Sequence, residues 1–310
     1  MNRRDALRKL AGGGAVALAT GFVSTTALTA PAEAEPVRAS KEAVGMLYDA
    51  TRCVGCQSCV AACAEANNLK PDTRLTGLHQ ASLDLNHLTK NIIKLYKPTG
   101  ASTWSYVKQQ CMHCVDPACV AGCSFHALTK DPQTGIVAWD ASKCSGCRYC
   151  QIVCPYSVPR FEWEGFNPKI VKCEMCRHRL AEGKEPACTS VCPTHAVIFG
   201  KREELLAEAK KRIAENPGKY FEDRVYGDKE GGGTQVLYLS AVPFENIALP
   251  ELGGESVAQS SLKWQRKIYQ YLAVPAVLYV SMVGVMRHNW KHHQEHLREE
   301  EEKTGLRPQL

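Results

Sequence analysis

Sixteen cysteines fall into four groups of four along this chain of 310 residues, with none left over. Groups one and three share the spacing Cys-x2-Cys-x2-Cys-x3-Cys, whereas the middle gap is x4 in group two and x11 in group four. Such regular grouping is typical of metal ligands, and it limits the chain to folds built around metal centres. The groups are Cys53, Cys56, Cys59 and Cys63; Cys111, Cys114, Cys119 and Cys123; Cys144, Cys147, Cys150 and Cys154; and Cys173, Cys176, Cys188 and Cys192.

The spacing indicates [4Fe–4S] clusters. A cubic cluster needs four thiolates, and a tight loop with two residues between ligands reaches three corners of the cube but not the fourth. The last cysteine of each group starts a helical turn and points toward a second cluster. We therefore expect ferredoxin-like units in which two groups exchange their fourth cysteines, and four [4Fe–4S] clusters in all.

Spacing alone leaves the pairing of the groups open. A hairpin predicted at 127–139 joins groups two and three, so these two form the obvious pair, and groups one and four then pair with each other. This interpretation gives four ligand sets, numbered as the clusters they would hold. Set 1 is Cys53, Cys56, Cys59 and Cys192; set 2 is Cys111, Cys114, Cys119 and Cys154; set 3 is Cys144, Cys147, Cys150 and Cys123; set 4 is Cys173, Cys176, Cys188 and Cys63.

Three other uses of the cysteines are less consistent with the sequence. Disulfides suit an exported chain with an even cysteine count, but cysteines close together on one loop rarely reach bridge geometry. Zinc ribbons use two separated Cys-x2-Cys pairs, so three ligands within seven residues argue against zinc, and a structural zinc-binding scaffold stays only as an alternative. A c-type haem requires Cys-x-x-Cys-His. Gln57, Val115, Arg148 and Arg177 occupy the histidine position in the four groups.

Residues 1–34 have the features of an export signal. Arg3 and Arg4 precede a weakly apolar stretch rich in alanine and glycine, and Ala32-Glu33-Ala34 is a small-x-small cleavage site. The adjacent arginines favour the twin-arginine route, which carries folded proteins and would allow cluster insertion before export. An ordinary secretory signal or an uncleaved anchor is the alternative.

A C-terminal transmembrane helix is expected at 268–286, where no residue is charged. At about 1.5 Å per residue this segment spans roughly 28 Å, enough for a hydrocarbon core. A linker at 259–267 would lead into it, and a cytoplasmic tail would follow at 287–310. The body would then lie on the periplasmic side of the inner membrane. A buried core helix is the alternative.

Between the two ends we expect an α+β body at 35–258, made of cysteine loops that alternate with short strands. Groups one and four would share a unit of 45–103 and 165–200, groups two and three a unit of 104–164, and 201–258 would be an extension. The segment between groups one and two is expected to be an insertion that covers one face. Strands are predicted at 45–49, 196–199 and 235–239, and an amphipathic helix at 202–214.

Composition and motifs exclude several function classes. The net charge of +6, from 38 basic and 32 acidic residues, is not concentrated in one folded region, so no nucleic-acid partner is indicated. Gly231-Gly232-Gly233 lacks the lysine and spacing of a phosphate loop. His113, His126 and His195 lie beside cysteines and are expected to pack or to form hydrogen bonds. No nucleophile–base pair is evident, so the chain is expected to be a non-catalytic electron-transfer subunit.

The chain resembles, over nearly its whole length, the four-cluster ferredoxin-like subunits of membrane oxidoreductases. These include the beta subunits of formate dehydrogenases and the iron–sulfur subunits of the dimethyl sulfoxide reductase type. It is most similar to the ferredoxin-like electron-transfer subunits of periplasmic membrane-bound [NiFe] hydrogenases of the hydrogenase-2 operon type. Its own export signal and C-terminal anchor favour that branch. The segments that carry the resemblance are 45–49, 108–117, 147–150, 197–200 and 229–236.

This resemblance implies a relay between protein partners. Electrons from hydrogen oxidation would leave the hydrogenase small and large subunits, cross the four clusters and reach a multi-spanning, quinone-reactive membrane subunit. The end of the body that holds groups two and three would face the membrane. The alternative is the beta subunit of a molybdopterin oxidoreductase such as formate dehydrogenase, with the same clusters and another electron donor.

Overall fold

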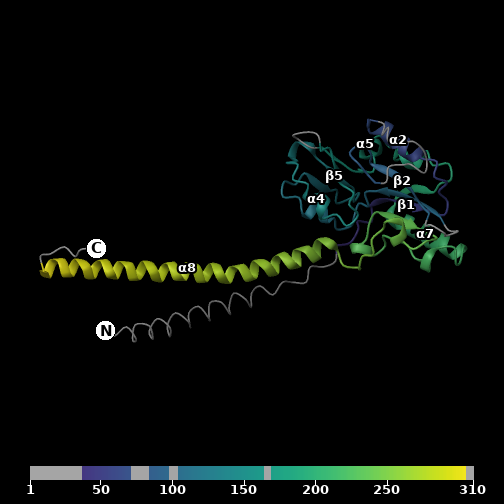
Figure 1. Ribbon diagram of the computed structural model, residues 1–310. Coiled ribbons are helices and arrows are strands. Elements are labelled where there is room, and N and C mark those ends of the chain that lie inside the picture. Colours follow the sequence, from purple (N-terminus) through teal and green to yellow (C-terminus); the bar gives the residue numbers. More distant parts are fainter. Residues whose placement is uncertain (1–36, 71–83, 98–103, 164–168, 305–310) are drawn as a thin grey trace. The chain divides into compact units, whose positions relative to one another are not determined.

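The computed structural model describes residues 37–70, 84–97, 104–163 and 169–304, without the side chains of 260–274, 276–277 and 300–304 (Figure 1). The chain divides into one unit that ends at Val37 and a second unit that begins at Arg38. The expected export signal at 1–34 lies outside the described residues. The second unit mixes helices and strands, in agreement with the expected α+β body.

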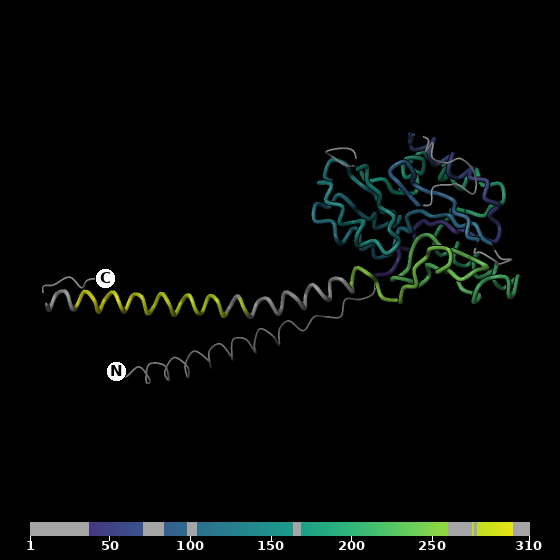
Figure 2. The backbone as a smooth tube through the Cα atoms, viewed as in Figure 1, coloured from purple at the N-terminus to yellow at the C-terminus, as the bar shows by residue number. Residues whose placement is uncertain are grey.

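The centre of this unit is a three-stranded sheet whose middle strand is β1 (Val44–Asp49). β8 (Val197–Lys201) pairs with β1 antiparallel on one side, and β9 (Val236–Leu239) pairs with it parallel on the other. Figure 2 shows the purple β1 segment among segments from much later in the sequence. Successive side chains of a strand point to opposite faces, and Met46 and Tyr48 join one core while Leu47 joins another. The three predicted strands are confirmed.

One face of the sheet is covered by α7 (Arg202–Glu215), which confirms the predicted amphipathic helix. Its apolar positions recur at helical spacing, so that one side of the helix is buried against the sheet. The buried Arg212 also forms an ion pair with Asp49 of β1, at 3.3 Å. The apolar layer between helix and sheet, here called the α7 core, contains no cysteine. Its buried residues are Leu47, Leu205, Ala209, Tyr220, Val225, Leu237 and Leu239.

The segment between cysteine groups one and two contributes to the core a hairpin that the sequence did not predict. It contains β2 (Asn91–Tyr96) and β3 (Ser105–Gln110), an antiparallel pair whose Ile92, Ile93 and Val107 belong to the main core. Two tyrosine hydroxyls join this hairpin to the central sheet. Tyr48 Oη donates to the Tyr106 carbonyl at 2.8 Å, and Tyr238 Oη donates to the Lys108 carbonyl at 2.6 Å.

A second hairpin, β4 (Leu128–Lys130) with β5 (Val137–Trp139), confirms the predicted connection between groups two and three. Its turn is stabilised by Asp131, whose Oδ1 accepts hydrogen bonds from the backbone of Gln133 and Thr134. The remaining strands are β6 (Arg160–Phe161) and β7 (Ile170–Val171). The short helices are α2 (Ser58–Ala66), α3 (Ala118–Ala121), α4 (Tyr149–Ile152), α5 (Arg177–Ala181) and α6 (Ala187–Ser190), with 3-10 turns at Ala141–Lys143, Phe221–Asp223, Glu230–Gly232 and Glu245–Ile247.

The C-terminal helix α8 runs from Val257 to Thr304 and contains Pro275. The expected transmembrane segment at 268–286 falls inside it, with the side chains of 268–274 and 276–277 outside the described residues. Within the described part of the chain, no helix is both long enough and apolar enough to cross a membrane. The expected C-terminal transmembrane helix at 268–286 stays a prediction.

Candidate iron–sulfur centres

The first two cysteines of each group lie on the same kind of turn. In every Cys-x2-Cys pair the residue two positions after the first cysteine has a positive φ, which directs its backbone N–H back toward the first thiol. The Met175 nitrogen lies 3.3 Å from Cys173 Sγ, and the Gly55 nitrogen lies 3.5 Å from Cys53 Sγ. The residues two positions after the first cysteine are Gly55, His113, Gly146 and Met175, with φ of 69°, 48°, 71° and 54°. The four groups thus share one local structure although their middle gaps differ.

The turns after the fourth cysteines are also alike. His126, Ser157 and His195 follow the fourth cysteines of groups two, three and four at the same distance, and each has φ of 50°. The side chains of His126 and His195 are exposed. The backbone N–H of each histidine closes this turn by donating to the carbonyl of the fourth cysteine, Cys123 or Cys192. The sequence did not predict this turn.

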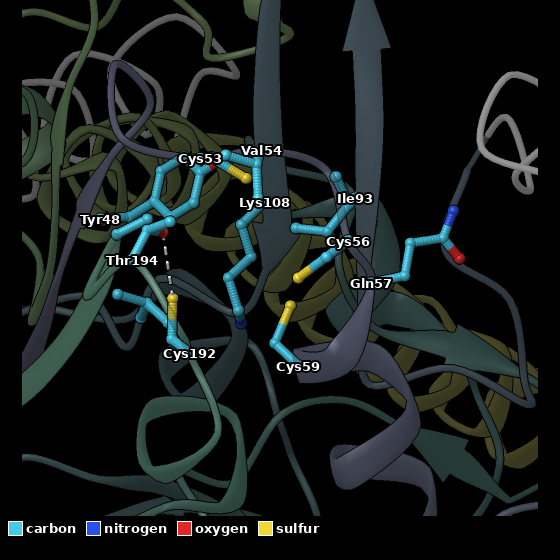
Figure 3. Close-up of a pocket in the computed structure, with 12 residues that line it drawn as sticks. Tyr48, Cys53, Val54, Cys56, Gln57, Cys59, Ile93, Lys108, Cys192 and Thr194 are labelled. Atoms are coloured by element: carbon cyan, nitrogen blue, oxygen red, sulfur yellow. Dashed lines mark hydrogen bonds between the residues drawn. The ribbon is translucent and has the colours of Figure 1, made fainter.

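Set 1 surrounds a cavity (Figure 3). Its lining includes Cys53, Cys56 and Cys59 from group one and Cys192 from group four, and Figure 3 shows these side chains around the same space. Lys108 of β3 extends into this space as well. Three cysteines of one group therefore meet the last cysteine of another group.

The other thiols gather in the same interleaved way, as their electrostatic interactions show. Each of the other three clusters of thiols combines three cysteines of one group with the fourth cysteine of another, as set 1 does. Cys63 interacts with Cys173, Cys176 and Cys188; Cys114 interacts with Cys111, Cys119 and Cys154; Cys150 interacts with Cys144, Cys147 and Cys123. All sixteen cysteines are free of disulfides. Among the described residues, no group of three or more His, Cys, Asp or Glu side chains could hold a single metal ion.

Burial dominates the acidity of most of these thiols. It raises the pKa of Cys59 to about 12 against the attraction of Lys108, and the pKa of Cys111 to about 11 against the attraction of Lys172. Thiols with such pKa values keep their protons in neutral solution. Their use as thiolate ligands therefore requires the positive charge of bound iron, which displaces the protons.

Hydrogen-bond donors around the thiols fit a bound cluster. Burial acts to raise the pKa of Cys192, but backbone N–H groups of Val197, Ala196 and Thr194 outweigh it and lower that pKa. The Thr194 hydroxyl adds a contact of 3.8 Å to the Cys192 sulfur, drawn as a dashed line in Figure 3. Such donors stabilise a sulfur that carries negative charge, as a ligand thiolate does.

His113 supplies a further donor beside set 2. Its Nδ1 accepts a hydrogen bond from the Val137 backbone at 3.0 Å, so the proton of the neutral ring is on Nε2. Nε2 is buried and has no hydrogen-bond partner among the described residues. A buried donor two residues after Cys111 fits the sulfur atoms of an iron–sulfur cluster, because such sulfurs accept hydrogen bonds.

Two buried lysines accompany the thiols, and the sequence reasoning missed both. Lys108 is 1% exposed and Lys172 is 2% exposed. Burial acts to lower the pKa of Lys108, but attraction to Cys188, Cys59 and Cys173 outweighs it and raises that pKa. The only sequence signal was position, because Lys172 directly precedes Cys173 and Lys108 begins a segment that leads into Cys111. Lysine is usually a surface residue, so composition gave no reason to bury it.

Replacing Gly55 by alanine is expected to prevent assembly at set 1 while leaving the other sets loaded. A Cβ at Gly55 would lie 2.4 Å from the Tyr106 ring, and φ there is 69°. The matched control is Gly183→Ala, because Gly183 has φ of 72° but a Cβ there would meet no other atom within 4 Å. We expect iron analysis to show a loss of about four irons per chain for Gly55→Ala and none for Gly183→Ala. Equal iron contents in the two variants would contradict this account of the turn.

Comparison with known proteins agrees with the geometry. The family described as 4Fe-4S dicluster domain matches residues 102–202, which contain groups two, three and four. The hydrogenase-2 operon protein HybA of Escherichia coli O157:H7 is 39% identical over 94% of this chain and 98% of its own length. The chain belongs to the HybA family of iron–sulfur proteins. The resemblance expected from the motifs is thereby confirmed, and so is the expectation of [4Fe–4S] clusters.

Less similar relatives are named as subunits of another enzyme, formate dehydrogenase. The iron–sulfur subunit of the nitrate-inducible formate dehydrogenase of Escherichia coli K12 is 33% identical over 70% of this chain and 73% of its own length. The formate dehydrogenase iron–sulfur subunit of Haemophilus influenzae is 32% identical over 70% of this chain and 69% of its own length. The relatives of this chain are therefore a hydrogenase-2 operon protein and iron–sulfur subunits of formate dehydrogenases.

Proposed function

We propose that this chain is a non-catalytic electron-transfer subunit that relays electrons from a periplasmic [NiFe] hydrogenase to a quinone-reducing membrane subunit. The strongest support from relatives is the match to HybA, which is named as a hydrogenase-2 operon protein and aligns over 94% of this chain. The proposed partners are the hydrogenase small and large subunits on one side and the quinone-reactive subunit on the other. The proposed location of the body is the periplasmic side of the inner membrane.

Four [4Fe–4S] clusters are part of the proposal, held by sets 1 to 4 as defined above. When bound, each cluster supplies a centre that accepts and releases one electron. The protein's own residues hold the clusters, exclude water from them and keep them close together. The interleaved gathering of the thiols supports these ligand sets, because every set combines three cysteines of one group with the last cysteine of another.

The observation that carries the proposal is that thiols of successive sets interact with one another, so that the sets can be ordered from neighbour to neighbour. Cys59 of set 1 interacts with Cys188 of set 4, Cys111 of set 2 interacts with Cys173 of set 4, and Cys119 of set 2 interacts with Cys150 of set 3. The order is therefore 1, 4, 2 and 3. Only two of the sixteen cysteines are exposed, Cys56 in set 1 and Cys147 in set 3. A series of centres that reaches the surface at its two ends suits entry of electrons at one end and exit at the other.

Deletion of the gene tests the relay. Without this chain, hydrogen-dependent quinone reduction by membranes is expected to stop, because the path between the hydrogenase and the quinone-reactive subunit is interrupted. Hydrogen oxidation with an artificial dye should continue, since the dye takes electrons directly from the hydrogenase. Restoring the gene should restore quinone reduction. Loss of the dye-linked activity as well would contradict a role limited to relay.

A second candidate function is favoured by the match to formate dehydrogenase iron–sulfur subunits. In that case the donor would be a molybdopterin enzyme, and the same clusters would carry its electrons. Affinity purification of the chain from solubilised membranes distinguishes the two, because hydrogenase subunits should copurify in the first case and a molybdopterin subunit in the second. A structural zinc scaffold would instead yield a colourless protein that contains zinc and no iron.

A further inference from the structure

Lys108 and Lys172 are both buried, and the one acidic side chain shown to interact with either is Glu174, which interacts with Lys172 without a salt bridge among the described residues. Neither side chain forms a salt bridge among the described residues. The Lys108 ammonium donates to Gln110 Oε1, and Gln110 is in turn held by Met46, whose sulfur lies 3.4 Å from Gln110 Nε2. The Lys172 ammonium donates to the carbonyls of Val137 and Cys173, the latter at 3.0 Å. All these acceptors are uncharged, so the positive charges are not neutralised by them.

The two lysines lie at different junctions in the order of thiol sets. Lys108 lines the cavity of set 1, as Figure 3 shows, and also interacts with Cys188 and Cys173 of set 4. Lys172 directly precedes Cys173 of set 4, and it interacts with Cys111 and Cys119 of set 2. The interactions that dominate at Cys150 of set 3 come from other thiols and from no lysine.

We propose that Lys108 and Lys172 set the reduction potentials of three of the four clusters, Lys108 for clusters 1 and 4 and Lys172 for clusters 4 and 2. This inference rests on the proposed binding of four clusters. A cluster ligated by four thiolates is anionic, and reduction adds one more negative charge. A buried positive charge therefore stabilises the reduced form more than the oxidised form, and it raises the potential. Cluster 4 lies beside both lysines, and cluster 3 beside neither.

These lysines suit this role because neutral oxygen atoms hold each ammonium group in place without neutralising its charge. A carboxylate partner would offset the positive charge, whereas carbonyl and amide oxygens orient the ammonium and leave its field to act on the sulfur atoms. Burial strengthens that field, because little water is present to screen it. Clusters 1, 4 and 2 are consequently easier to reduce than they would be without the lysines.

The test is a redox titration of the full chain loaded with iron under anaerobic conditions, followed by electron paramagnetic resonance with dithionite as reductant. Lys108→Met is expected to lower the potentials of clusters 1 and 4, and Lys172→Met those of clusters 4 and 2. Cluster 4 is therefore affected by both variants. In the double variant cluster 4 should shift by about the sum of the two single shifts. Lys108→Arg and Lys172→Arg keep the charge and should stay close to the wild-type potentials.

Lys184→Met is the matched surface control, because Lys184 is exposed and paired with Glu182 at 2.9 Å. It should leave all four potentials unchanged. Unchanged potentials in the methionine variants at full iron content would overturn the proposal, as would arginine variants that shift as far as the methionine variants.

Glutamine variants cover the case in which methionine prevents cluster uptake, since glutamine is neutral but can still form hydrogen bonds. Lowered potentials in iron-loaded glutamine variants support the proposal, and unchanged ones overturn it. If every neutral variant lacks clusters while the arginine variants are loaded, the charges serve assembly and the proposed tuning is wrong. A wild-type chain with far fewer than about sixteen irons would instead contradict the proposed function itself.

Discussion

Replacing Cys154 by alanine is expected to remove one cluster whose other three ligands come from a different cysteine group. Cys154 is the last cysteine of group three, but it belongs to set 2 and interacts with Cys114 of group two. The iron content should fall from about sixteen to about twelve per chain, because one four-iron cluster is lost. Hydrogen-dependent quinone reduction should stop as well, since set 2 lies in the middle of the proposed order.

Double variants show which group loses its cluster. Cys111→Ala combined with Cys154→Ala should lose no more iron than Cys154→Ala alone, because both residues belong to set 2. Cys147→Ala combined with Cys154→Ala should fall to about eight irons per chain, because sets 2 and 3 are then both broken. The reverse pattern, in which the pair Cys147 and Cys154 loses only one cluster, would mean that each group ligates its own cluster.

Removal of the clusters is expected to unfold most of the body but to spare the α7 core. The main core includes Cys59, Cys111, Cys173 and Cys188, and the third core, around Leu128 and Val137, includes Cys150. Both cores lose their metal attachments when iron is chelated, and bound metal contributes about 10 kcal/mol or more to small metal-dependent folds. A loss of that size is comparable to the whole stability of a typical domain, about 5–15 kcal/mol, and is enough to open these regions.

Hydrogen exchange measures this difference along the chain. After oxidation and chelation, amides in 104–163 should lose protection by about 1,000-fold or more, equivalent to about 4 kcal/mol. Amides of α7 should keep theirs, because the α7 core contains no thiol and the buried pair Asp49 and Arg212 ties the helix to β1. Asp49→Asn is the opposite control, since it should reduce protection in α7 while the clusters stay bound. Uniform loss of protection on chelation would show that the α7 core depends on the clusters.

The sequence predicted the chemistry of this protein better than it predicted the path of the chain. Cysteine spacing indicated the clusters because ligand geometry restricts spacing directly. The strands at 45–49 and 235–239 were predictable because most of their residues are buried on both faces of the sheet and apolar. Spacing could not decide the pairing of the groups, because the fourth cysteine of a group lies beside thiols of another group that long-range folding brings to it.

The hairpin of β2 and β3 was missed for a related reason. Asn91, Lys108 and Gln110 are buried polar residues at positions where a buried strand normally has apolar ones. Pattern rules assume that buried positions are apolar, and these positions violate the rule because they lie beside the thiols. The same assumption kept Lys172 out of the predicted site. Such failures of sequence pattern are expected where function requires charge in the interior.

The position of β1 in the central sheet has a consequence for biosynthesis. This strand leaves the ribosome early, whereas its two neighbours, β8 and β9, are translated only near the end of the body. Until then β1 has two open edges, and the last cysteine of set 1 is also still missing. The nascent chain thus cannot complete the first ligand set before Cys192 has been made, nor the sheet before β9 has been made. The cluster of that set is therefore expected to be completed only after Cys192 has emerged, when most of the body has already been translated.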